Sequence, residues 1–536
     1  MKKFFTLIAL CAGIMNASAT DYAGKLRVVL NGQSATVQDA TISVVEDNGK
    51  YTLTLNNFMF DAGEESIMPI GNIVVKDVEA TSDGKNTFLK TKQDINITEG
   101  TLEGVDSWLG PILCLGGPIP VSINAVMQSD ILKTQIDIPF GELNIKVVFD
   151  NRQFQIPNSD FENFHKATAG TGENAVESDE PNNWHSFMTA TGMLAGIVST
   201  TPHTFISEDV RPESTGSKSV LIKSGLVLGS IVANGTLTTG RLMAGGFSAT
   251  DTKNNAFLDI TKEDKDPNGD PYYTLLSSKP DAISLWVKFK QGSGAPAEYP
   301  YATITAAITD GSYYQEPVDK DYNDIIVAYA KDNKIESTGE WHKLTIPFDY
   351  ATYTKATDPK AILVTISTNA EPGQGSDTRK ENAKEDELYV DDLHLDYSAE
   401  LADIAVGENS VADFKSDKTD YEYTFAIGTM PTMDEIAGMI KATTVSKEAY
   451  AFVAMEEVGK KITATILTVA ADLEATKTYT VTFSEGTDGI ENTISDEKTA
   501  PKEIYNMKGQ KVASMKNGEV YIVKYADGKT VKVIKK

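Results

Sequence analysis

The segment that decides the fold ends with the residues Leu388-Tyr389-Val390-Asp391-Asp392-Leu393-His394-Leu395-Asp396-Tyr397. It opens with Asn158-Ser159-Asp160-Phe161-Glu162-Asn163. Between these two stretches, apolar and β-branched runs predict further strands: Ser219–Lys223, Ala282–Phe289, Tyr301–Thr309, Asp324–Ala330, Trp341–Pro347 and Ile362–Ser367. The polar stretches 167–181, 261–271 and 369–386 predict exposed loops. We therefore expect an all-β module that carries acidic residues on its first and last strands.

The composition limits the number of domains and the kinds of partner. A chain of 536 residues is long enough for several domains, each with its own core. The formal net charge of −27 argues against a nucleic-acid partner, because the phosphates would be repelled. Cys11 and Cys114 are the two cysteines, so no CxxC pair exists to hold a structural zinc ion.

The N-terminus has the features of a secretory signal peptide. Lys2 and Lys3 precede the apolar run Phe4–Met15, and Ala17-Ser18-Ala19 forms a small-x-small cleavage site. The apolar run is shorter than the roughly 20 residues that a spanning helix needs. We expect residues 1–19 to be removed by cleavage near Ala19. The remaining protein would then have no transmembrane segment and would be secreted, or associated with the outer membrane at the cell surface.

Residues 20–153 contain many short stretches of alternating apolar and polar residues, a pattern typical of a barrel or a sandwich. The stretches Tyr22–Leu26, Tyr51–Phe58 and Gly71–Val75 resemble the calycin-like β-barrel domain of exported Bacteroidetes proteins. This resemblance implies a closed barrel whose mouth is a natural site for a small ligand. A small barrel can also be filled by its own side chains, so both alternatives stay open.

Residues 156–398 resemble a second family. The markers are Asp324-Ile325-Ile326-Val327-Ala328, Trp341-His342-Lys343-Leu344-Thr345-Ile346-Pro347-Phe348 with Tyr350, and Tyr389-Val390-Asp391-Asp392, and they occur in the family's order. They resemble the Bacteroidetes family named "putative carbohydrate metabolism domain". The resemblance implies a jelly-roll β-sandwich with a sugar-sized pocket. It indicates a class of ligand rather than a reaction.

Residues 400–485 predict a further β-sandwich. They resemble the cadherin-like or immunoglobulin-like spacer domains of exported bacterial proteins, which hold other domains apart. Thr432 with Glu435 predicts a capping box at the start of one short helix. No candidate site is found in this spacer.

A polar linker, residues 486–501, leads to a small β tail, residues 502–536. The tail contains the tight-turn pairs Asn517-Gly518 and Asp527-Gly528. It resembles the C-terminal sorting domain of type IX secretion. The resemblance implies docking on secretion machinery or on a surface partner, and the alternative is a plain hairpin cap.

Known catalytic signatures are missing from the sequence. There is no nucleophile elbow, phosphate loop or HExxH motif. The histidines are scattered and show no metal-binding spacing: His165, His185, His203, His342 and His394. The acidic loop Asp264-x-Asp266-x-Asn268-Gly269 matches the first half of an EF-hand, but Leu275 stands where the bidentate glutamate belongs. We therefore interpret this loop as an ordinary polar loop.

A structural calcium ion is the sharpest hypothesis about a cofactor. Carbohydrate-binding jelly rolls often share an ion between a carboxylate on the first strand and one on the last. Glu162 and the pair Asp391-Asp392 match those places. Because neighbouring residues of a strand face opposite sides, only one of the pair should meet Glu162, and we favour Asp392. The alternative is that these acids cap strand ends or pair with lysines.

Glycan-binding sites use aromatic rings to stack on sugars and polar groups to fix hydroxyls. The aromatic candidates in loop-rich surroundings are Trp184, Tyr272, Tyr273, Tyr313 and Tyr314, and the weaker polar candidates are Arg211 and Asp324. Trp286, which alternates with Leu285 and Val287, is expected in the core. Trp341, which opens a strand, is expected there too.

The sequence as a whole predicts an exported, all-β, multi-module protein. Its order is signal peptide, calycin-like barrel, jelly-roll sandwich, immunoglobulin-like spacer and sorting-type tail. The predicted function is non-catalytic glycan binding by the jelly roll. Two alternatives stay open. One is a glycoside hydrolase-like enzyme with an unrecognised carboxylate pair, because some pair among 76 acids will have suitable spacing by chance. The other is a structural or adhesin-type surface protein.

Overall fold

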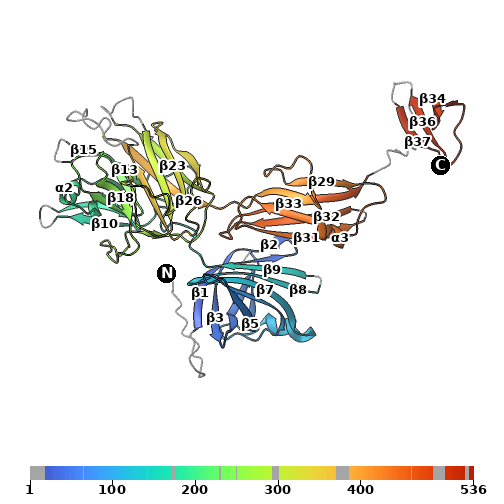
Figure 1. Cartoon of the computed structure of the whole chain (residues 1–536), viewed down its shortest axis with the longest axis horizontal. Helices are drawn as coiled ribbons and strands as arrows, with labels where there is room; N and C mark the ends of the chain where they lie inside the picture. Colours follow the sequence, from blue (N-terminus) through green and yellow to red (C-terminus); the bar gives the residue numbers. More distant parts are fainter. Residues whose placement is uncertain are drawn as a thin grey trace. The chain divides into compact units, whose positions relative to one another are not determined.

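The computed structural model describes residues 19–63, 66–141, 143–170, 173, 175–227, 231–248, 250–292, 301–369, 385–459, 461–486, 501–525 and 530–535. The predicted signal peptide, apart from Ala19, and most of the predicted linker lie outside these residues. The chain divides into two compact units, each described here by itself (Figure 1). The first comprises Met1–Ala399, Val445–Tyr450 and Val469–Thr476. The second comprises Glu400–Thr444, Ala451–Thr468 and Lys477–Lys536.

The N-terminal part of the first unit is a closed antiparallel β-barrel, as predicted. Its strand order is β1-β3-β4-β5-β6-β7-β8-β9, and β1 pairs with β9 to close it, with Leu26 opposite Phe149. The elements are β1 (Ala19–Leu30), β2 (Gln33–Ser34), β3 (Gln38–Asp47), β4 (Lys50–Asp61), β5 (Ile67–Ser82), β6 (Thr87–Ile95), α1 (Leu109–Leu113), η1 (Cys114–Gly116), β7 (Ile119–Gln128), β8 (Ile131–Phe140) and β9 (Leu143–Asp150).

Alternate residues of the barrel strands form one apolar core, because successive side chains of a strand point to opposite faces. Leu26, Leu89, Leu132 and Phe149 belong to this core, and each is at most 1% exposed. The proposal that the barrel also receives a small ligand at its mouth stays a prediction.

Gly71 in β5 is a position where the barrel needs a glycine. Its φ of 121° lies in the region that side chains other than hydrogen disfavour. The next residue, Asn72, donates its backbone N–H to the Thr98 carbonyl at 2.9 Å, and this contact brings the backbone close. A Cβ on Gly71 would lie 2.2 Å from the Thr98 carbonyl oxygen. The backbone could accept a side chain there only by moving.

The substitution Gly71→Ala should therefore lower the free energy of unfolding of the barrel by about 3 kcal/mol or more. Gly84→Ala is the matched control, because Gly84 also has a positive φ, of 92°, but has open space around its missing Cβ. The control should cost only about 1–2 kcal/mol. Hydrogen exchange of the amides of β5 and β6 measures both effects, and an equal loss of protection in the two variants would contradict the prediction.

The remainder of the first unit contains a β-sandwich of two main sheets. One five-stranded sheet has the order β12-β13-β26-β20-β24, and the other has the order β16-β25-β21-β23 with β19 paired to β25. The strands are β12 (Thr204–Ser207), β13 (Ser219–Lys223), β16 (Thr236–Thr238), β19 (Thr274–Leu275), β20 (Ala282–Lys290), β21 (Tyr301–Thr309), β23 (Ile326–Glu336), β24 (His342–Pro347), β25 (Ala361–Ser367) and β26 (Glu387–Asp396).

The two sheets share one core. Ile283, Leu285, Val287 and Phe289 of β20 lie in it together with residues of β21 and β25. The start of the module adjoins its last strand, because the Leu393 N–H donates to the Ser159 carbonyl at 2.9 Å. The expected first strand at residues 158–163 is wrong, since these residues form a turn and an irregular segment, and Glu162 therefore lies just before the first strand of the module.

Smaller elements surround the sandwich. The hairpin β10 (Phe164–Ala169) and β11 (Val176–Pro181) precedes it, and β17 (Arg241–Ala244), β18 (Asn254–Leu258) and β22 (Tyr314–Glu316) form a three-stranded sheet. The others are η3 (Phe187–Thr189), α2 (Ala195–Val198), β14 (Gly225–Val227) and β15 (Ile231–Ala233). No helix among the described residues has the length and apolar character required to cross a membrane.

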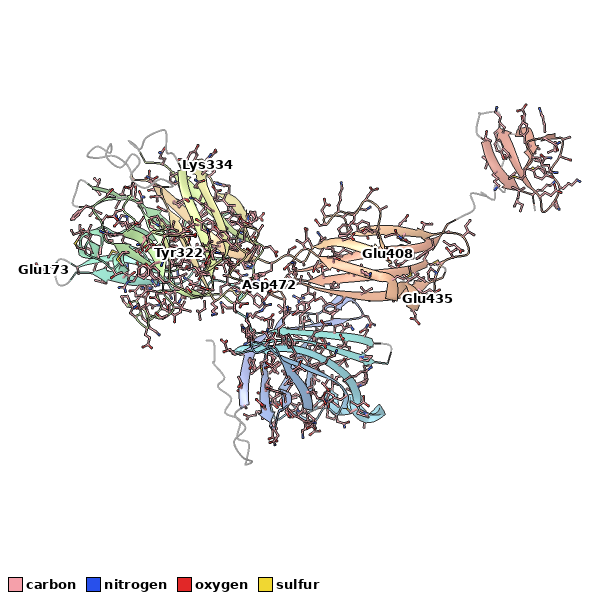
Figure 2. All side chains as sticks on the ribbon, viewed as in Figure 1. Glu173, Tyr322, Lys334, Glu408, Glu435 and Asp472 are labelled. Carbon is pink, nitrogen blue, oxygen red and sulfur yellow. The ribbon has the colours of Figure 1, made fainter. Side chains whose placement is uncertain are left out.

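The second unit begins with two sheets around a common core, ordered β28-β27-β30 and β29-β33-β32-β31. The elements are β27 (Leu401–Val406), β28 (Asn409–Ser410), β29 (Asp420–Phe425), α3 (Met433–Met439), β30 (Ile440–Thr444), β31 (Tyr450–Val458), β32 (Lys461–Val469) and β33 (Thr476–Glu485). The predicted capping box is confirmed, since Thr432 caps α3 and Glu435, labelled in Figure 2, binds back to the Thr432 N–H.

The C-terminal tail forms a sheet with the order β35-β34-β36-β37. Its strands are β34 (Pro501–Asn506), β35 (Lys511–Val512), β36 (Val520–Tyr525) and β37 (Thr530–Ile534). Tyr521, Val523 and Val533 form its small core. Gly518 has the positive φ, 80°, that its predicted tight turn requires, whereas the turn at Asp527-Gly528 lies outside the described residues.

Candidate functional site

The outer face of the sheet β12-β13-β26-β20-β24 carries aromatic and charged side chains. Along β20, the residues that alternate with the buried Leu285 and Val287 point away from the core, and they include Trp286 and Lys288. Pairing with β26 places Tyr389 opposite Lys288 and Asp391 opposite Trp286. We call this surface, together with Asp209, Arg211, Trp341 and Asp392 at its margins, the aromatic face.

One half of the aromatic face is built around Lys288. Its ammonium lies 4.4 Å from the ring centroid of Tyr389 and 5.2 Å from that of Trp341, and these two rings meet edge to face at 6.3 Å. Lys288 also pairs with Asp209, which accepts a hydrogen bond from Trp341 Nε1 at 3.0 Å. The ion pair of Lys288 with Asp209 therefore orients both rings, because Lys288 contacts the rings of Tyr389 and Trp341 and Asp209 binds Trp341.

The other half is built around Arg211. Its guanidinium lies 5.7 Å from the ring centroid of Trp286 and pairs with Asp392, while its backbone N–H donates to Asp391 Oδ2 at 3.0 Å. The pairing of β20 with β26 is irregular between Ser284 and Trp286, and Asp392 has a positive φ of 42°. This bulge overrides strict alternation, which is why both aspartates contact Arg211 although the sequence predicted opposite directions.

Asp391 is buried and electrostatically unfavourable in its charged form. Burial, assisted by the neighbouring Asp392 charge, raises the pKa of Asp391 to about 6. The hydrogen bond from the Arg211 backbone N–H acts in the opposite direction and lowers the pKa, but its effect is smaller. The Oδ1 atom of Asp391 is buried and makes no hydrogen bond within the described part of the chain. Asp391 as a whole is 1% exposed, so its carboxyl group is buried.

The raised pKa predicts how stability changes with pH. Well below pH 3.8, the ordinary pKa of this carboxyl, Asp391 is protonated in both the folded and the unfolded state. Because folding favours the protonated form, stability is lost as the pH rises from about 3.8 to about 6. Asp391→Asn removes the ionisation, so the variant should gain roughly 1–2 kcal/mol relative to the wild type between pH 4 and pH 7. Calorimetric Tm values at both pH values measure it, and a difference independent of pH would refute the prediction.

The carboxylates predicted to bind calcium have protein partners in the structure. Glu162 accepts hydrogen bonds from the backbone N–H groups of Ser217 and Lys218, both at 2.9 Å. Asp391 and Asp392 bind Arg211, as described above. Among the described residues, the groups of histidine and acidic side chains close enough to share an ion do not include these three. The calcium site stays a prediction, and an ion there would have to compete with these contacts.

The structure distributes the predicted glycan contacts over different surroundings. Trp184 is fully buried and packs on Phe161, so its ring has no face available for a sugar. Tyr314 is buried in the core beside Tyr322. The ring of Tyr272 is also buried, with its centroid 4.6 Å from that of His185.

Three of the predicted residues remain accessible. Tyr313 is 39% exposed and stacks on Phe257 at 5.8 Å, and Tyr273 is half-buried. Asp324 is exposed and pairs with Lys355. Of the predicted set, Arg211 alone lies on the aromatic face.

Sequence reasoning missed Trp286 and Trp341, which it assigned to the core. Both are partly exposed. The alternation of Trp286 with Leu285 and Val287 already contained the correct signal, because it places Trp286 on the opposite face of the strand from those two core residues. The contact of Trp341 with Asp209 joins residues far apart in the sequence, and no local pattern could have shown it.

Comparisons with known proteins support the N-terminal assignment. Residues 19–152 match the family model of the calycin-like beta-barrel domain. A crystal structure from Bacteroides thetaiotaomicron VPI-5482, described as a "putative glycoside hydrolase", is 14% identical to this chain; the match covers 72% of this chain and 99% of that one, with a TM-score of 0.29. A likeness at this level supports no statement about activity. No curated protein matches the chain.

Proposed function

We propose that this protein binds glycans without cleaving them, at or outside the cell surface, and that the aromatic face of the sandwich is the binding site. The observation that carries the proposal is the gathering of Trp286, Trp341 and Tyr389, all partly exposed, on one sheet face. Sugar rings present C–H groups to such aromatic rings, and the guanidinium of Arg211, whose side chain is 20% exposed, offers donors for hydroxyls.

Affinity electrophoresis of the full mature chain through gels containing xylan, mixed-linkage glucan, mannan, pectin or mucin tests this proposal. At least one polysaccharide should retard the wild type. Trp286→Ala and Tyr389→Ala should each weaken retention by about 30-fold, since a central aromatic contact contributes about 2 kcal/mol. Tyr313→Ala is the matched control, because it removes an exposed ring outside the aromatic face and should leave retention unchanged.

Two outcomes would replace the proposal. Release of reducing sugar from the same polysaccharides would favour the enzyme, and the carboxylates responsible would then have to be found by substitution. A structural or adhesin-type role would be favoured if cells that lack the protein lose their attachment to surfaces and no polysaccharide gel retains the purified protein. Loss of retention in Tyr313→Ala with full retention in Trp286→Ala would move the site to the three-stranded sheet.

The ends of the chain belong to the same proposal. We propose export by the predicted signal peptide, and docking of the tail, residues 502–536, on secretion machinery or on a surface partner. Cell fractionation of the whole chain and of a chain truncated after residue 485 tests this. Equal surface display of both would exclude a sorting role for the tail.

A further inference from the structure

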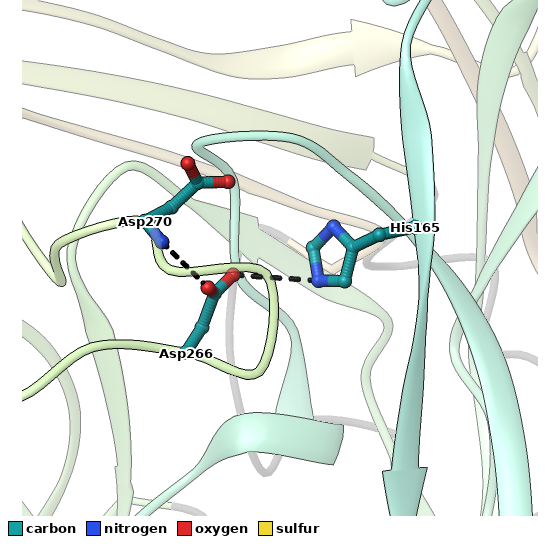
Figure 3. Close-up of side chains that lie close together, drawn as sticks. All are labelled: His165, Asp266 and Asp270. Atoms are coloured by element: carbon teal, nitrogen blue, oxygen red, sulfur yellow. Dashed lines mark hydrogen bonds and ion pairs between the residues drawn. The ribbon is translucent and has the colours of Figure 1, made fainter.

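A buried group of two histidines and two carboxylates lies in the same module, apart from the aromatic face. His165 of β10 and Glu180 of β11 are directly opposite each other in their hairpin. His185 follows β11. Asp266 belongs to the acidic loop that begins at Asp264, which the sequence alone predicts to be an ordinary polar loop. Two overlapping sets, His165-Asp266-Asp270 and Glu180-His185-Asp266, each have ligand-type atoms within 4.8 Å of one another. Figure 3 shows the first set.

The hydrogen bond of His185 fixes which of its nitrogens carries a proton. Its Nε2 lies 3.2 Å from the Pro271 carbonyl oxygen, which can only accept, so Nε2 is the protonated nitrogen. Nδ1 is then left with a lone pair, and it lies 3.7 Å from Asp266 Oδ2. Neither atom makes a hydrogen bond within the described residues. Two lone-pair atoms thus face each other in a fully buried position.

His165 repeats this arrangement. Its Nδ1 lies 3.1 Å from the Asn182 Oδ1, an acceptor, so Nδ1 carries a proton, and in the neutral ring Nε2 carries the lone pair. Nε2 lies 3.3 Å from Asp266 Oδ2 and 3.8 Å from Glu180 Oε2. It too is buried and makes no hydrogen bond with any described residue.

The carboxylates are oriented by their other oxygens. Asp266 Oδ1 accepts the Asp270 N–H at 2.8 Å, which leaves Oδ2 directed at His165 (Figure 3). The same Oδ2 lies 3.7 Å from His185 Nδ1. Glu180 Oε1 accepts the Ser186 N–H at 2.7 Å and the Ser186 hydroxyl, and Oε2 is directed at His165. Glu180 Oε2 also accepts a hydrogen bond from the Thr189 hydroxyl at 3.4 Å. No hydrogen bond within the described residues is made by the other three atoms, His165 Nε2, His185 Nδ1 and Asp266 Oδ2.

We propose that His165, His185, Asp266 and Glu180 bind a divalent transition-metal ion of the zinc class, with Asp266 as the ligand that the two overlapping sets share. A bound cation would satisfy these buried acceptor atoms, and leaving such atoms without any partner costs free energy of folding. Tetrahedral zinc bonds of about 2.0–2.2 Å place neighbouring ligand atoms roughly 3.3–3.6 Å apart. The separations of 3.3 Å and 3.7 Å from Asp266 Oδ2 to the nearest nitrogens of His165 and His185 are close to that range. His165 Nε2 and Glu180 Oε2 are 3.8 Å apart. Neither set of ligand atoms within 4.8 Å of one another contains both histidines, so these side chains would have to move closer together when an ion binds.

The ligand types select the metal. Imidazole nitrogen suits zinc and its neighbours, whereas calcium prefers six to eight oxygens. The Pro271 carbonyl, Asn182 and the Asp270 N–H orient the ligands from behind, as second partners do in metal sites. The side chains of Glu180, His185 and Asp266 are 0% exposed and that of His165 is 10% exposed, so the ion would hold the hairpin and the acidic loop together rather than meet a large substrate. The proposal does not depend on glycan binding.

The test uses the full mature chain, stripped of metal with EDTA. Titration with Zn²⁺ should show one tight equivalent per chain and a raised Tm, and Co²⁺ should give visible absorption bands of a nitrogen- and oxygen-ligated ion. Asp266→Asn and His165→Gln should each weaken Zn²⁺ binding on the order of 100-fold or more. Asp264→Asn is the matched control, because Asp264 lies in the same loop but pairs with Arg241 and should leave binding unchanged.

Stability without metal gives an independent readout. In the stripped protein, Asp266→Asn should have the same Tm as the wild type or a higher one. An ionised carboxylate has no proton to donate, whereas the NH2 group of asparagine can donate a hydrogen bond to an unprotonated histidine nitrogen. No uptake of Zn²⁺ by the wild type, or equal uptake by Asp266→Asn, would overturn the proposal. If both variants fail to fold, the wild-type Co²⁺ spectrum decides, and absence of the bands would overturn the proposal.

Discussion

The pairing of β20 with β26 is the constraint on which the rest of the sandwich depends. These two strands lie next to each other inside the five-stranded sheet, and the two-residue period of a strand divides their side chains between two environments. Ile283, Leu285 and Val287 enter the core, and in consequence Trp286 and Lys288 must point outward. The aromatic face exists because the core on the other side of the sheet fixes the register.

The bulge opposite Trp286 refines this arrangement. An extra residue in β26 places Asp391 and Asp392 where both reach Arg211, and Arg211 in turn lies over Trp286. A regular strand would have sent one carboxylate into the apolar core, where an unpaired charge is costly. The bulge therefore allows an acidic pair in the middle of a strand and orders one side of the proposed glycan site.

The aromatic face and the buried histidine–carboxylate group use opposite physical principles. The first is a surface whose rings stay partly exposed, which suits reversible contact with the proposed glycan ligand. The second is closed, and its four ligand-type groups are oriented by partners on their far sides. We infer that the first serves recognition and the second serves the integrity of the hairpin and loop beside the sandwich.

The sequence by itself determined the features that depend on near neighbours. Alternation gave the all-β class and the barrel, turn residues gave the hairpins, and Thr432 with Glu435 gave the capping box of α3. Only the tertiary structure decided which residues meet: it buried Trp184, exposed Trp286, and brought Asp266 to His165 although a hundred positions separate them. The physical reason is that a strand's period specifies the face a side chain takes, whereas its neighbours across sheets and loops are set by packing of the whole module.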